Sequence, residues 1–107
     1  MIDVSQFNRE AWNLQSDEGC RWSTPFPDGR IEAARSGDWE VHLSPGKAVP
    51  RGWFPESLDG CELLCLASGG GQQVPLFAAA GARVTTVEHS DSQLQKDIDA
   101  AARHGVE

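Results

Sequence analysis

The chain has 107 residues, which is enough for one domain but short for a sheet built from two three-stranded halves. Its 16 acidic residues outnumber its 9 Lys and Arg residues, and the net charge of -7, with no basic run, argues against a nucleic-acid partner. No apolar stretch is long enough to span a bilayer, and no charged leader precedes an apolar core, so we expect a cytoplasmic protein with no membrane partner.

Residues 1–60 predict an amino-terminal segment of short helices and irregular chain. Ser5 can cap a helix that runs to about Gln15, and a second helix is predicted from Asp28 or Gly29 to Arg35. The alternation over Trp39–Leu43 predicts a short, half-buried strand or an extended segment. All four tryptophans lie in this half of the chain, and we expect them to build a small core of their own rather than to stack on a ligand.

Residues 61–107 predict a β-α-β-α unit. An apolar run, Cys61–Leu66, is typical of a buried parallel strand, and it enters a glycine-rich turn at residues 67–71, which we call the glycine turn. A helix over Val74–Ala80, with Pro75 in its first turn, leads to a β-branched strand at Arg83–Val87. The three cysteines form no C-x-x-C pair, so we expect reduced, buried side chains and no metal site.

The last predicted helix begins after Ser90, which has capping-box spacing to Gln93, and ends near Gly105. Helical periodicity predicts an inward apolar stripe of Leu94, Ile98 and Ala101 or Ala102. The late acidic residues, among them Asp97 and Asp99, are then expected on one solvated face, and His104 is expected to be solvated as well.

The glycine turn and Glu88 form the candidate site. A glycine turn lets the backbone approach a ligand closely, and the crevice beyond the carboxyl ends of parallel strands is where open α/β sheets bind ligands. Glu88 ends the second strand about 20 residues further on, where a carboxylate can accept hydrogen bonds from both hydroxyls of a ribose. The pattern therefore predicts a nucleotide-type site.

Two segments carry a resemblance to a known family. Leu63–Gly71 resembles the first motif of the class I S-adenosylmethionine-dependent methyltransferases, and Val87–Leu94 resembles the acidic segment that follows it. Asn8–Asn13 is similar, more weakly, to an amino-terminal helix of these enzymes. The resemblance implies an α/β, Rossmann-like methyltransferase fold, incomplete in this chain, with S-adenosylmethionine as cofactor.

By position, the resemblance implies that the glycine turn lines the methionine part of the cofactor, that Glu88 holds its ribose and that His89 lies beside its adenine. The full set of implied cofactor-binding residues is Ala67, Ser68, Gly69, Gly71, Gln73, Glu88, His89, Ser90 and Gln93. Two positions depart from the family pattern, because Cys65 replaces a common acidic residue and Ala67 replaces the first glycine. No catalytic residue and no methyl acceptor can be named.

Two alternatives stay open at this stage. One is a half-domain that binds a nicotinamide or flavin dinucleotide, although Val74 and Pro75 replace the third glycine that such a site favours. The other is a non-catalytic interaction module that recruits a partner along an exposed sheet edge. In the methyltransferase family that the first motif resembles, the strand at the position of Cys61–Leu66 is central in the sheet. We therefore expect one edge of this strand to be bare, which favours self-association. We also expect no methyl transfer by the 107-residue chain alone.

Overall fold

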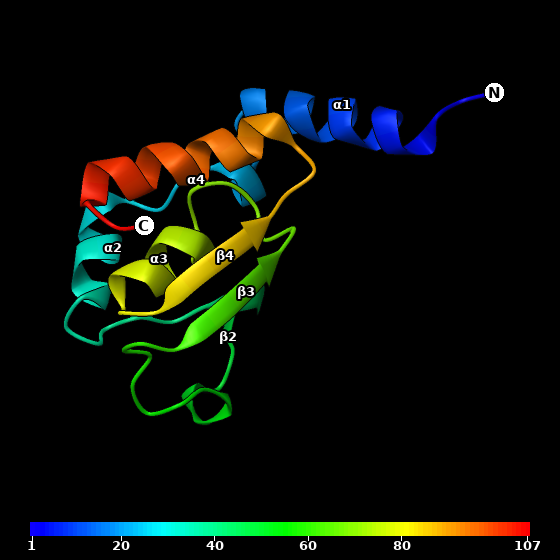
Figure 1. The fold of residues 1–107 in the computed structure, drawn as a ribbon. Helices are drawn as coiled ribbons and strands as arrows, with labels where there is room; N and C mark the ends of the chain where they lie inside the picture. Colours follow the sequence, from blue (N-terminus) through cyan, green and yellow to red (C-terminus); the bar gives the residue numbers. More distant parts are fainter.

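Two parallel strands lie at the centre of the fold, β3 (Glu62–Leu66) and β4 (Arg83–Val87) (Figure 1). They pair in register from Glu62 opposite Arg83 to Leu66 opposite Val87. The computed structural model describes all residues, 1–107. Its other elements are α1 (Val4–Asp17), η1 (Arg21–Ser23), α2 (Asp28–Ala34), β1 (His42–Ser44), β2 (Lys47–Ala48), η2 (Arg51–Trp53), α3 (Gln73–Ala79) and α4 (Asp91–His104). The predicted β-α-β-α unit is therefore present, with the second strand at its predicted bounds.

One face of the β3–β4 sheet is covered and the other is open. The helices α2, α3 and α4 pack together on the covered side (Figure 1). On the opposite side Leu64, Leu66 and Val87 are 59%, 66% and 59% exposed. The second edge of β3 has no partner, because the hairpin β1–β2 forms a separate antiparallel sheet. The predicted bare edge is thus present, together with an apolar face beside it.

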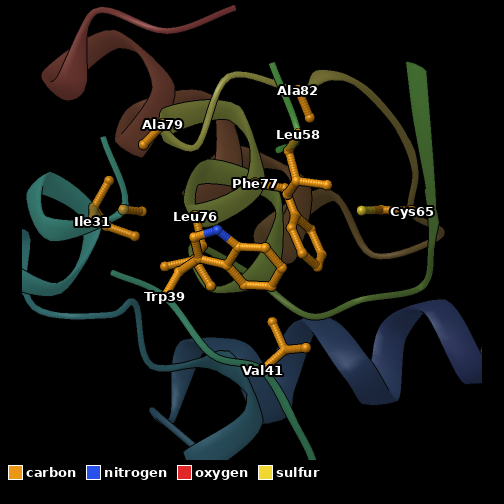
Figure 2. Close-up of a cluster of buried hydrophobic side chains, with 10 residues drawn as sticks. Ile31, Trp39, Val41, Leu58, Cys65, Leu76, Phe77, Ala79 and Ala82 are labelled. Carbon is orange, nitrogen blue, oxygen red and sulfur yellow. The ribbon is translucent and has the colours of Figure 1, made fainter. Parts of the chain in front are cut away.

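Both halves of the chain contribute to one hydrophobic core (Figure 2). Trp39 packs edge-on against Phe77, with ring centroids 5.6 Å apart, and against Phe54 at 5.2 Å. The buried cluster comprises Ile31, Ala34, Trp39, Val41, Leu58, Cys65, Leu76, Phe77, Ala79 and Ala82. Residues 1–60 and 61–107 therefore do not build separate cores.

The expectation of a tryptophan core was wrong for three of the four tryptophans. Trp12 and Trp22 are 46% and 42% exposed, and Trp53 is 74% exposed. The first helix also begins two residues earlier than predicted, because Asp3 rather than Ser5 caps it through a hydrogen bond from the Gln6 N–H. Its contacts with α4 include hydrogen bonds from Ser90 and Ser92 to the Asn13 side chain, while its apolar residues Phe7 and Leu14 are 61% and 56% exposed.

Helix α4 has the predicted ends but not the predicted inner face. Ser90 caps it by accepting from the Gln93 N–H, and Gly105 ends it in the left-handed conformation. Its buried residues are Gln93, Asp97, Ala100 and His104, whereas Ile98 is 52% exposed. The expectation that Asp97 and His104 are solvated was therefore wrong. His104 Nδ1 lies 2.7 Å from a Glu32 carboxylate oxygen, so a polar partner on α2 makes its burial possible.

None of the helices combines the length and apolar character needed to cross a membrane.

Candidate functional site

A cleft of about 780 Å³ lies at the carboxyl ends of β3 and β4. One wall consists of the start of the glycine turn and the residues that follow β4, Glu88 and His89. The facing residues come from the amino-terminal half of the chain and from the β1–β2 hairpin. They are Asn8, Trp12, Arg21, Trp22, Phe26, Arg30, and residues 42–46. The cleft therefore depends on segments that are far apart in the sequence.

The glycines of the turn are required by protein packing. A Cβ on Gly69 would lie 2.5 Å from the backbone oxygen of Trp22, and a Cβ on Gly71 would lie 2.8 Å from the Pro25 ring. A Cβ on Gly70 would lie 2.9 Å from the backbone oxygen of Gln93 on α4. We predicted that ligand approach explains these glycines, but their Cβ directions are occupied by the chain itself. The turn is held between the Trp22–Pro25 segment and α4.

Backbone conformation adds a second requirement at the turn. Gly69 and Gly71 have φ of 84° and 74°, in the region that L-residues rarely adopt. Ala67 also has a positive φ, 50°, and it is the one non-glycine residue of the chain that does. Its N–H donates to the Val87 carbonyl at 2.9 Å, which extends the parallel pairing by one residue beyond β3. Ala67 therefore occupies a position where glycine would be less strained.

Polar contacts fasten the segment at residues 21–24 to the turn and to α4. The Gln72 amide donates to the carbonyls of Arg21 and Thr24, both at 2.8 Å. The Ser23 hydroxyl donates to the Gln93 side chain at 2.8 Å, and the Lys96 ammonium donates to the Ser23 carbonyl at 2.6 Å. Because these groups are used internally, Gln72 and Lys96 hold the segment in place, and Gln72 also lines the cleft.

Glu88 has one carboxylate oxygen engaged and one without a partner. Oε1 accepts from the Ser90 N–H at 3.0 Å, while Oε2 is buried and makes no hydrogen bond. The hydroxyl of Ser68, a residue of the glycine turn that lines the cleft, is buried and makes no hydrogen bond either. Buried polar groups in folded proteins are normally hydrogen-bonded, so these two groups are suited to contacts with a polar ligand. A vicinal diol is one such ligand group, since both of its hydroxyls can donate to a carboxylate.

Asp97 is a buried acidic residue beside the glycine turn, although the sequence analysis placed it in solvent. It is 3% exposed, and its Oδ1 accepts from the Gly71 N–H at 2.7 Å. Burial raises the pKa of this carboxyl from 3.8 to about 6; the Gly71 hydrogen bond opposes that shift, and the negative charge of Glu88 adds to it. Burial likewise raises the pKa of the Cys65 thiol; the nearby Ser68 hydroxyl opposes that shift, and the charge of Asp97 adds to it. A buried acidic group therefore lies directly under the glycine turn.

The structure brings most of the predicted site residues to the cleft. The residues that line it are Ala67, Ser68, Gly69, Gln73, Glu88, His89 and Gln93. Gly71 and Ser90 lie outside it: Gly71 packs on Pro25, and Ser90 is fully buried and donates to the Asn13 side chain at 2.6 Å. His89 is exposed, and its ring contacts the Ser5 carbonyl at 2.8 Å. No group of three or more His, Cys, Asp or Glu side chains is arranged to hold a metal ion.

Four side chains of the cleft have no local signal in the sequence. Trp12 and Trp22 present aromatic surface, and Arg21 and Arg30 present positive charge. Arg30 is partly used, because it stacks on Phe26 at 3.7 Å and donates to a backbone carbonyl. Their approach to the glycine turn depends on how the amino-terminal segment folds back, which no pattern of neighbouring residues reports.

The fold and the site define a parallel β-α-β-α domain with a ligand-sized cleft at its strand ends. Over 99 residues, 92% of its length, the chain is 43% identical to the uncharacterized methyltransferase YbaJ of Bacillus subtilis (strain 168). The chain spans 38% of the length of that relative. No protein-family model matches the chain. The similarity supports a methyltransferase family and confirms the resemblance drawn from Leu63–Gly71 and Val87–Leu94.

Proposed function

We propose that this chain forms the cofactor-binding portion of a Rossmann-like methyltransferase that uses S-adenosylmethionine. The observation that carries the proposal is the unpartnered, buried Oε2 of Glu88 in a cleft bordered by the glycine turn. A carboxylate at the end of the second strand suits a ribose diol. Because the relative is called a methyltransferase, the adenosyl ligand that we propose is a methyl donor.

The residues around the cleft fit the other parts of this cofactor. The turn residues Ala67 to Gly69 border the space for the methionine moiety, and the exposed His89 borders that for adenine. Arg21 makes no ion pair within the chain, and its guanidinium lies over the Trp22 ring at 5.1 Å, so its N–H groups can donate to the cofactor's carboxylate.

When bound, S-adenosylmethionine supplies a methyl group on a sulfonium sulfur, which a nucleophile attacks in line. The contribution of this chain is to bind and orient the donor, since positioning accounts for much of the rate of such a displacement. The aromatic side chains of Trp12 and Trp22 line the cleft and offer apolar surface to a bound ligand.

A dinucleotide cofactor fits this site less well. Dinucleotide folds place the pyrophosphate on the N–H groups of the helix that follows the glycine turn. Here that helix, α3, has only 7 residues, and Pro75 in its first turn has no N–H to donate. The methyl donor has no pyrophosphate and does not need these donors.

Calorimetric titration tests the proposal with three ligands: S-adenosylmethionine, S-adenosylhomocysteine and NAD. We expect both adenosyl ligands to bind and NAD to bind more weakly or not at all. Glu88→Ala should weaken adenosyl binding by about 1–3 kcal/mol, the range for a lost hydrogen bond with a stranded partner. Glu62→Ala, at the opposite end of β3 and exposed, is the matched control and should leave binding unchanged. Equal binding by the Glu88 variant and the parent chain would show that the ribose assignment is wrong.

A further inference from the structure

Beneath the glycine turn, several buried polar atoms lack partners. They are Ser68 Oγ, Thr86 Oγ1, Glu88 Oε2 and Asp97 Oδ2. Two of the four belong to carboxylates, and the two carboxyl groups are close enough to affect each other's charge. This region therefore has more acceptors than donors, and it is negative when both acids are ionised.

Asp97 contributes a charge that the packing of the turn does not need. Its Oδ1 holds the Gly71 N–H at 2.7 Å, a contact that the neutral oxygen of an asparagine could also make. Ionisation at this 3% exposed position is opposed by burial and by Glu88. A buried charge of this kind is stabilised when an opposite charge binds nearby.

No cation of the chain neutralises Asp97. The ionisable groups that face it are the Cys65 thiol on β3 and the Glu88 carboxylate after β4, and neither carries positive charge. On its own helix, Lys96 donates to the carbonyls of Ser16 and Ser23, at 2.6 Å each. No positive side chain of the chain therefore offsets the charge of Asp97 when it is ionised, and a cationic ligand in the nearby cleft would do so.

We propose that the buried Asp97 carboxylate makes this site prefer a cationic ligand, and thereby favours the sulfonium methyl donor over its neutral demethylated product. This inference rests on the proposed function. Asp97 acts here as a specificity-determining residue through its charge and its hydrogen bond to Gly71, without touching the ligand. Release of the product after transfer would follow from the loss of positive charge at sulfur.

The expected effect is roughly tenfold. One full charge about 10 Å from another, at an effective dielectric constant of about 20, changes an affinity by about one order of magnitude. S-adenosylmethionine and S-adenosylhomocysteine share the adenosine, the ammonium and the carboxylate, so their affinity ratio isolates the sulfonium charge and its methyl group. Sinefungin, with an amine in place of the sulfonium, separates the charge from that methyl group.

The experiment measures the dissociation constants of these three ligands by calorimetry at pH 5 and pH 8. At pH 8 the parent chain should prefer S-adenosylmethionine and sinefungin over S-adenosylhomocysteine, and Asp97→Asn should reduce both preferences roughly tenfold. In the parent chain the preference should also fall at pH 5, whereas in Asp97→Asn it should not change with pH. Asp99→Asn removes the same charge from an exposed position of the same helix and should behave like the parent.

Three outcomes would overturn the inference. One is an unchanged preference in Asp97→Asn. Another is an equal reduction in Asp99→Asn, which would indicate an effect of net charge alone. The third is a pH dependence that persists in Asp97→Asn, which would assign the effect to Glu88. If the parent chain binds S-adenosylhomocysteine normally in these cases, the proposed function stands; if no adenosyl ligand binds to any variant, the proposed function and this inference both fail.

Discussion

Asp97→Asn should change how the stability of the chain depends on pH. The pKa of Asp97 lies at about 6 in the folded chain, mainly because of burial, against an ordinary value of 3.8. The folded state therefore holds this proton more tightly than the unfolded state does. The stabilisation from the protonated group is fully present below pH 3.8 and is lost as the pH rises through about 6.

The two pKa values set the magnitude. Each tenfold change in proton affinity is worth about 1.4 kcal/mol, so the difference between the two pKa values corresponds to a stabilisation of about 3 kcal/mol. Most of this stabilisation is lost between pH 4 and pH 8. Asparagine keeps an acceptor for the Gly71 N–H but cannot ionise. The difference in free energy of unfolding between Asp97→Asn and the parent chain should therefore shift by about 2–3 kcal/mol in favour of the variant over this pH range.

Urea denaturation followed by tryptophan fluorescence at pH 4, 6 and 8 measures this shift. The comparison between pH values removes any constant cost of the asparagine NH₂ group, which would otherwise obscure the result. Asp99→Asn is the control, and its difference from the parent chain should be nearly constant with pH. If the Asp97→Asn difference is the same at pH 4 and pH 8, the carboxyl is not buried in a charge-disfavouring environment and the reasoning fails.

Three further predictions concern the glycine turn and the sheet. Ala67→Gly should raise the free energy of unfolding by about 1 kcal/mol, because it relieves a positive φ. The control Ala102→Gly, at an exposed helical position, should lower the free energy of unfolding by a similar amount. If both variants lower the free energy of unfolding, the backbone at Ala67 is not strained. Gly69→Val should prevent folding, as read by circular dichroism, because its Cβ would lie 2.5 Å from a backbone oxygen; a folded variant would contradict the packing. The isolated chain should self-associate through the open edge of β3 and the exposed Leu64, so light scattering that shows a strict monomer at all concentrations would exclude this.

Local sequence signals were sufficient for the elements of residues 61–107. The β-branched run predicted β4 at its observed bounds, and Ser90 and Gly105 marked the ends of α4. The position of Pro75 placed it correctly in the first turn of α3. These signals work because capping, strand propensity and the conformational freedom of glycine involve residues only a few positions apart.

The same local rules also indicated where a cleft would form. An apolar strand, a glycine turn and an acid at the end of the next strand were sufficient to place the cleft beside the turn and Glu88. They could not show that the amino-terminal segment supplies the facing wall. Trp22 reaches the turn only because Gln72 and Lys96 bind the carbonyls of residues 16–24, contacts that span 48 to 80 positions of the chain.

Which face of α4 is buried was decided by the tertiary structure alone. Periodicity of apolar residues placed Ile98 inside and Asp97 in solvent, and the reverse is observed. Asp97 can be buried because the backbone N–H of Gly71, 26 residues earlier, donates to it. The sequence by itself determined the helices, the strands and the turn, since these depend on neighbouring residues. The charge beneath the turn and the second wall of the cleft depend on partners brought close only by folding, so only the tertiary structure could decide them.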